Sequence, residues 1–131
     1  MTVGVSTVNT ANAWLNVFRG GGSGVTFTAP ATLFVQLHTA DPGASGTTAV
    51  ASASTRNALT LAAASGGAVA LGTLSAFTGT ATETISHISV WSASSAGTFY
   101  WSAALTTPKA INSGDTLTFT TVGVSISPLA A

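Results

Sequence analysis

The chain has 131 residues, of which 46% are hydrophobic and only 5% are charged. Three basic residues balance three acidic ones, so the chain has no basic surface to neutralise the phosphates of a nucleic acid. We therefore expect that the protein does not bind nucleic acid. The absence of cysteine excludes disulfides and thiolate metal sites.

The first predicted element is a short helix near the N-terminus. Ser6 or Thr7 is a suitable N-cap, and Arg19 suits the last turn. Between these positions, apolar side chains recur at helical spacing at Val8, Ala11, Trp14, Leu15 and Phe18. This apolar stripe requires a partner, which is either the domain's own sheet or a neighbouring subunit, and we expect Trp14, Leu15 and Phe18 to dock on it.

The helix is followed by a glycine-rich joint. Residues 20–24 read GGGSG, a sequence that ends helices and behaves as a flexible linker. We therefore predict two parts, an N-terminal helical arm with its joint at residues 1–24 and a β domain at residues 25–131. The N-terminus lacks the basic and apolar regions of a signal peptide, and no apolar run is long enough to span a membrane.

The first half of the predicted β domain contains one strong strand signal. Residues 25–27 form a possible short strand, and Leu33–Thr39 alternates Leu33, Val35 and Leu37 with polar or aromatic neighbours on the other face. Ala40–Gly46 predicts a turn in which Asp41 accepts backbone hydrogen bonds and Gly43 supplies a positive φ. The small, polar residues that follow, up to Ser54, predict an exposed loop.

The middle of the chain predicts a strand, a turn and an interrupted strand. Arg56–Ala62 places Leu59 and Leu61 on one face, and Ser65–Gly67 turns the chain. The segments Ala68–Leu71 and Thr73–Phe77 are interpreted as one interrupted strand, with Gly72 as a bulge or a bend. Residues 78–82 form another loop.

The stretch Thr84–Phe119 is predicted to form the centre of an antiparallel sheet. It contains two of the three Trp and the only Tyr, arranged as strand, turn, strand, turn and strand. A last strand is predicted around Val122–Ile126. The total is about seven to nine short strands, which indicates an all-β fold, either a single antiparallel β-sandwich (jelly-roll-like) or a barrel, preceded by a short helix.

The residues that could carry chemistry do not form a recognisable catalytic motif. His38 and His87, with Asp41 or Asp115, can be combined on paper with a serine into a triad, or among themselves into a zinc site. No GxSxG elbow and no metal-ligand spacing supports either arrangement. We therefore predict no catalytic residues, no metal site and no cofactor.

The acidic residues are better explained by turns than by catalysis. Glu83 and Asp41 could be paired acids of a glycosidase, yet with Asp115 they are the only acids of the chain. Each lies in a turn or strand-edge context, where a carboxylate accepts hydrogen bonds from backbone amides. Turn stabilisation is thus the favoured interpretation, and a cell-wall hydrolase is the least favoured function.

The clustered aromatics allow two interpretations. On a strand from Thr98 to Ala103, Phe99 and Trp101 point to one face and Tyr100 to the other. We favour core or subunit contacts for Trp91, Tyr100 and Trp101. The alternative is a surface that stacks on host glycan, which requires exposed rings.

Four runs of sequence resemble one family of proteins. They are Ala29–Gly43 (APATLFVQLHTADPG), Ser86–Trp91 (SHISVW), Gly97–Leu105 (GTFYWSAAL), and Lys109 with Ser113–Thr116 (SGDT). Together they resemble small structural proteins of tailed bacteriophages, described as tail-fibre-like, minor tail or head-decoration proteins, notably in phages of actinobacteria. The resemblance covers most of residues 6–127 and departs at Ala49–Arg56, where the family pattern has acidic and aromatic residues.

The resemblance implies a non-enzymatic virion component with a compact β-sandwich that repeats by symmetry as a homotrimer. Its expected partners are copies of itself and the major capsid or tail protein, and it would be made in the host cytoplasm. The low charge independently favours association, because little repulsion separates the molecules. The alternative function is a host-surface glycan-binding module of a phage tail.

Overall fold

A computed structural model describes residues 3–19, 28–53 and 55–127. These residues form ten strands, one π-helical turn and one short α-helix. In chain order the elements are β1 (Gly4–Val5), η1 (Thr7–Ala11), α1 (Asn12–Phe18), β2 (Leu33–His38), β3 (Asn57–Leu61), β4 (Ala68–Val69), β5 (Leu71–Leu74), β6 (Phe77–Thr78), β7 (Glu83–Trp91), β8 (Phe99–Ile111), β9 (Thr116–Leu117) and β10 (Val124–Ser125).

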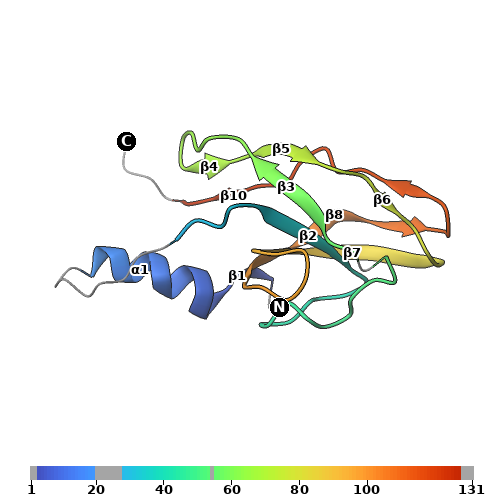
Figure 1. The fold of residues 1–131 in the computed structure, drawn as a ribbon, viewed down its shortest axis with the longest axis horizontal. Helices are drawn as coiled ribbons and strands as arrows, with labels where there is room; N and C mark the ends of the chain where they lie inside the picture. Colours follow the sequence, from blue (N-terminus) through green and yellow to red (C-terminus); the bar gives the residue numbers. More distant parts are fainter. Residues whose placement is uncertain (1–2, 20–27, 54, 128–131) are drawn as a thin grey trace.

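The main sheet has six strands in the order β1-β8-β7-β2-β3-β5, and every pairing in it is antiparallel. Two small two-stranded sheets, β10-β4 and β6-β9, form the second layer that completes the sandwich (Figure 1). The predicted all-β, antiparallel sandwich with a short N-terminal helix is confirmed.

The predicted centre of the sheet, Thr84–Phe119, is confirmed for its first two strands, whereas its third strand, β9, pairs with β6 in the second layer. β7 pairs with β2 on one side and with β8 on the other, so it is an interior strand. Its register places Val90 beside Val35 of β2 and beside Trp101 of β8. Because side chains alternate along each strand, these residues lie on one face of the sheet, and that face forms the core.

The core lies between the main sheet and the second layer. The main sheet contributes apolar side chains from β2, β3, β7 and β8, and the second layer contributes Phe77, Leu117 and Val122. Phe77 and Phe119 meet edge to face, with ring centroids 6.0 Å apart. Burial of this apolar surface is the main stabilising contribution that the sandwich makes.

The predicted exposed loop up to Ser54 is exposed at most of its described residues, but the prediction is wrong for Ala51 and Ala53. Ala51 and Ala53 are almost fully buried, and the Ala51 amide donates to the Leu37 carbonyl at 3.0 Å, so this segment extends the sheet beside the end of β2. Pro42 is also buried. Sequence composition suggested exposure because small residues leave no strong periodic signal, whereas an alanine fills a narrow space in the core without cost. Ser54 lies outside the described residues.

The turns follow the chemistry that the sequence predicts. Asp41 Oδ1 accepts a hydrogen bond from the Gly43 amide at 2.9 Å, and Gly43 has a φ of +74°. Opposite β3, the register passes from Thr73 to Leu71 and leaves Gly72 as the extra residue of a bulge, as predicted. A Cβ at this glycine would lie 2.8 Å from Thr60 Oγ1, which explains why no side chain occupies the position.

The predicted strand after residue 67 is divided into three. β4 pairs with β10, β5 pairs with β3, and β6 pairs with β9, so each piece serves a different partner. The chain has to bend between these pieces to pass from one sheet to another. The strand predicted at 25–27 and the joint predicted at 20–24 lie outside the described residues.

Candidate functional site

The N-terminal helical segment is attached to the outer edge of the sheet. β1 pairs with β8 through Gly4 opposite Ser102. The Ser6 amide and the Thr10 hydroxyl both donate to the Tyr100 carbonyl, at 2.6 and 2.8 Å, and the Asn9 side-chain amide donates to the Phe99 carbonyl at 2.9 Å. Residues 4–10 are therefore built onto β8, and the division predicted at residue 24 stays a prediction.

Helix capping follows the predicted pattern at Ser6. Its side chain accepts a hydrogen bond from the Asn9 amide at 3.3 Å. The first turn is π-helical, because the Ala11 amide donates to the Ser6 carbonyl five residues earlier, at 2.9 Å. A π turn inserts one extra residue, so the face of the helix that meets the sheet differs from the one that a regular α-helix would present.

The predicted apolar stripe is mostly exposed. Polar residues, Thr10 among them, make the contact with β8, whereas Leu15 is 66% exposed and Phe18 is 85% exposed. Trp14 is half-buried and lines a small apolar pocket of about 160 Å³ between the helix and the sheet. In Figure 1, α1 extends beyond the end of the sheet.

Exposed apolar side chains concentrate on this segment. Among the described residues, seven large hydrophobic side chains are exposed, and five of them belong to residues 5–18: Val5, Val8, Leu15, Val17 and Phe18. We call these five residues the N-terminal apolar face. Leu15 and Phe18, three residues apart, share one side of α1, and exposed apolar side chains that gather in one segment are typical of an interaction surface.

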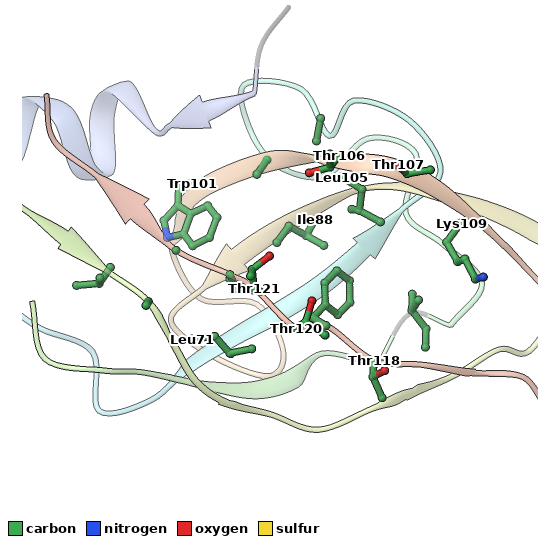
Figure 2. Close-up of a pocket in the computed structure, with 18 of the residues that line it drawn as sticks. Leu71, Ile88, Trp101, Leu105, Thr106, Thr107, Lys109, Thr118, Thr120 and Thr121 are labelled. Atoms are coloured by element: carbon green, nitrogen blue, oxygen red, sulfur yellow. The ribbon is translucent and has the colours of Figure 1, made fainter.

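A groove runs between β8 and the chain segment that follows β9 (Figure 2). It has a volume of about 790 Å³. Figure 2 shows Trp101 toward one end, Lys109 toward the other, and Ile88 and Leu105 between the two walls. Threonines supply much of the polar lining: Thr106, Thr107, Thr116, Thr118, Thr120 and Thr121.

A large bulge in β8 shapes one wall of this groove. Lys109 pairs with Ile85 and Ala104 pairs with His87, so residues 105–108 stand opposite Ser86 alone. Such a bulge bends the strand, and Pro108 within it has no amide to offer to another strand. The groove therefore presents side chains, and the edge beside it is protected against strand addition.

The two buried tryptophans do not provide a sugar-stacking surface. Trp91 is 6% exposed and Trp101 is 7% exposed, so little of either indole is open to a sugar ring. Tyr100 is half-buried and packs against the core. Trp91 packs against Phe99, with centroids 5.4 Å apart, on the face of the sheet opposite the core. Subunit contact through Tyr100 stays a prediction.

The opposite face of the sheet carries a buried polar chain that motif reasoning missed. His38 Nε2 lies 2.7 Å from Ser89 Oγ, and His38 Nδ1 lies 2.8 Å from the Thr48 carbonyl. The Trp91 indole N–H donates to the same Ser89 oxygen at 2.7 Å. One sequence signal could have found it. Ser89 and Trp91 are two residues apart on β7, so their side chains lie on the same face of the sheet, and His38 of the neighbouring strand β2 lies on that face too.

The geometry determines which nitrogen of neutral His38 carries the proton. A carbonyl only accepts, so His38 Nδ1 carries the proton and Nε2 accepts from the Ser89 hydroxyl. Burial lowers the pKa of His38 from its ordinary value of 6.5; the bond to the Thr48 carbonyl opposes this, and the nearby His87 and Arg56 add to it. Ser89 is fully buried, so this serine–histidine pair has no approach for a substrate.

Arg56 connects this buried polar cluster to the hairpin loop 92–98. Its guanidinium carbon lies 3.8 Å from the centroid of the Trp91 ring. Nη1 donates to the Ala93 and Ala96 carbonyls at 3.0 and 2.6 Å, and Nε donates to Gln36 Oε1 at 3.1 Å. Partial burial lowers the pKa of Arg56. Its role in the described fold is to hold the loop against the sheet.

The carboxylates serve the backbone, as the sequence predicts. Glu83 accepts from the Ser52 amide through both oxygens, at 3.1 and 3.0 Å, and Asp115 Oδ2 accepts from the Asn112 amide at 2.8 Å. Asp41 and Glu83 thus stabilise separate loops. Within the part of the chain that the structure describes, no three His, Asp or Glu side chains are grouped closely enough to hold a metal ion. Nor does any helix of those residues have the length and apolar character needed to cross a membrane.

A comparison with models of protein families gives a match to this chain. A family model described as "Podophage GP4 fiber I protein gp80" matches residues 4–127, which is nearly the whole chain. A search of curated proteins gave no match.

Proposed function

Because this chain belongs to the podophage GP4 fiber I protein gp80 family, a family of phage fibre proteins, we propose that it is a non-enzymatic building block of the fibre that assembles through its N-terminal apolar face. Membership in the family implies a structural role in the virion, together with other phage proteins. The family description supports a fibre location over the capsid-decorating location that the sequence left open.

The observation that carries the assembly proposal is the concentration of exposed apolar side chains on residues 5–18. Hydrogen bonds to β8 fix the start of this segment, so its outer side is presented by a rigid support. Leu15 and Phe18 together offer the largest exposed apolar side chains of α1. Burying them against a partner would remove apolar surface from water, which favours association at about 25 cal/mol per Å².

We propose that three copies associate through this face and that the same arm contacts a neighbouring fibre or tail protein. Closed symmetry lets an identical patch on each copy be covered by the next. The chain has no net charge, so repulsion between copies does not oppose this arrangement. Trp14 is proposed to brace the arm from within, because it lines the pocket between the helix and the sheet.

The test is the mass of the purified full chain in solution, measured by light scattering after size exclusion. A trimer has about 38 kDa, three times the 12.8 kDa of one chain. The double substitution of Leu15→Ser and Phe18→Ser should reduce the mass to that of one chain while the circular dichroism spectrum stays the same. A matched control is Val50→Ser, an exposed apolar residue outside the arm.

Point substitutions are preferable to deletion of the arm, because deletion would also remove β1 and its pairing with β8. A monomeric wild-type chain would contradict self-assembly, and so would a double variant that keeps the mass of the wild type. Incorporation of the double variant into phage particles at the wild-type level would contradict docking of the arm on another virion protein.

A second candidate function is binding of a host glycan in the groove, and it rests on the hydroxyl-rich lining around an apolar floor. Thr118→Val with Thr120→Val removes two hydroxyls at nearly constant volume, and Thr84→Val, on an exposed residue of β7, is the control. Saturation-transfer NMR with host polysaccharide should lose its signal only in the first variant. No signal with the wild-type chain would end this candidate.

A further inference from the structure

One cluster on the outer face of the sheet is used neither by the assembly proposal nor by the groove. It consists of His38, Ser89, Trp91 and Arg56, and it links β2, β7 and the hairpin loop 92–98 through consecutive side-chain contacts. His38 and Ser89 are fully buried, and Trp91 is nearly so. All buried side-chain polar atoms among the described residues have a partner.

The order of donors and acceptors in this cluster depends on one proton. In neutral His38, Nε2 accepts the Ser89 O–H, and this orientation leaves the Ser89 oxygen free to accept the Trp91 N–H. A second proton on His38 would make Nε2 a donor. Ser89 Oγ would then face two donors, and its own proton would lose its acceptor in a buried place.

Protonation would also place a positive charge near the Arg56 guanidinium. His87 on β7 is the register partner of His38, and Arg56 before β3 lies close enough to affect it. The loop that covers His38 contributes the neutral Thr48 carbonyl, and its one acid, Asp41, uses Oδ1 to accept from the Gly43 amide. A cationic His38 would therefore repel Arg56, the residue that holds the loop carbonyls.

We propose that His38, Ser89, Trp91 and Arg56 form a proton-sensitive latch that holds the hairpin loop 92–98 against the sheet and releases it when His38 takes up a proton. We call this cluster the His38 latch. It is independent of how the copies assemble, because none of its members belongs to the N-terminal apolar face. Release changes the loop while the core on the other face of the sheet stays packed.

The test uses NMR of the full chain over a range of about pH 7.5 to 4.5. The Trp91 indole N–H reports on the bond to Ser89, and the Thr98 amide, which donates to Ser92 Oγ, reports on the loop. As the pH falls, the Trp91 resonance should shift. The Thr98 amide should lose protection against hydrogen exchange, after correction for the intrinsic rate. The Val90 amide, in the centre of the sheet, should keep its protection.

Three variants separate the members of the latch. His38→Gln should abolish the pH response of both reporters, whereas His87→Gln, which changes the other histidine of the chain, should retain it. Ser89→Ala keeps His38 but removes the shared oxygen, so His38 should still titrate while the Thr98 amide responds less than in the wild type. This variant also covers the case in which His38→Gln does not fold.

Several results would overturn the proposal. One is a loop response in His38→Gln or Ser89→Ala equal to that of the wild type. Another is loss of the response in His87→Gln. A third is simultaneous loss of protection at Thr98 and Val90, because that pattern is unfolding of the whole domain and not release of a loop.

Discussion

Substitution of Gly46 by alanine tests whether the loop after β2 is packed against the outer face of the sheet as tightly as the structure indicates. The residue has a φ of +73°, and a Cβ added to it would lie 2.5 Å from Cδ2 and 2.9 Å from Cε2 of Phe99. Phe99 is buried and rests against Trp91, so its ring has little room to move away. Gly46→Ala should therefore be strongly destabilising.

The magnitude follows from two separable costs. An alanine forced into the left-handed region costs about 1–2 kcal/mol, and overpacking a filled space costs about 1–3 kcal/mol more. We therefore expect Gly46→Ala to lower the free energy of unfolding by about 2–5 kcal/mol. Gly66→Ala is the matched control, because Gly66 has a φ of +56° and open space around its Cβ position, and only the first cost applies.

The assay is urea denaturation followed by tryptophan fluorescence, at one protein concentration so that association does not alter the comparison. The difference between the two variants measures the contact with Phe99. Adding Phe99→Leu to Gly46→Ala should recover part of the loss, because the smaller side chain makes room. Equal destabilisation by Gly46→Ala and Gly66→Ala would refute the packing argument.

Three further predictions concern the core, the loop anchor and pH. Leu37→Ala, at a fully buried position, should lower the free energy of unfolding by about 2–5 kcal/mol. Leu15→Ala, on the exposed side of α1, is the control and should change monomer stability by less than about 0.5 kcal/mol. Both values are obtained from the midpoint of urea denaturation. Arg56→Ala should cost about 2 kcal/mol, and a value near zero would show that its contacts with the loop contribute nothing. The lowered pKa of His38 means that the unfolded chain binds the proton more readily, so this contribution to stability is complete above about pH 6.5 and decreases as the pH falls through that value. His38→Gln should flatten the dependence in that range, and an unchanged slope would assign it to other groups.

The family and the class of fold were accessible from the sequence. The alternation of Leu33, Val35 and Leu37 defines a strand without reference to any partner, and the Asp41-Pro42-Gly43 turn is determined by local backbone chemistry. The same holds for the Ser6 cap and for the bulge at Gly72. Each of these features depends on residues within a few positions of one another, so the sequence alone was sufficient to predict them.

The candidate interface was only partly predictable. Leu15 and Phe18 were chosen correctly as apolar residues of a helix, yet sequence periodicity could not say that a π turn would let Thr10 meet β8 and leave them exposed. In the same way, the polar character of the loop before Ser54 concealed the burial of Ala51 and Ala53. Burial is a property of what lies opposite a residue, which its own neighbours in the chain do not reveal.

Local sequence patterns were enough to predict the local conformations and the likeness to a fibre family, whereas the partner of each segment depends on the folded chain as a whole. The segment after residue 67 reads as one strand but serves three sheet pairings, and His38, Ser89 and Arg56 meet although they are far apart in the chain. Local dihedral preferences and side-chain alternation act over a few residues. Strand pairing and the closing of a buried hydrogen-bond chain depend on contacts between distant segments, and these exist only once the whole core has formed.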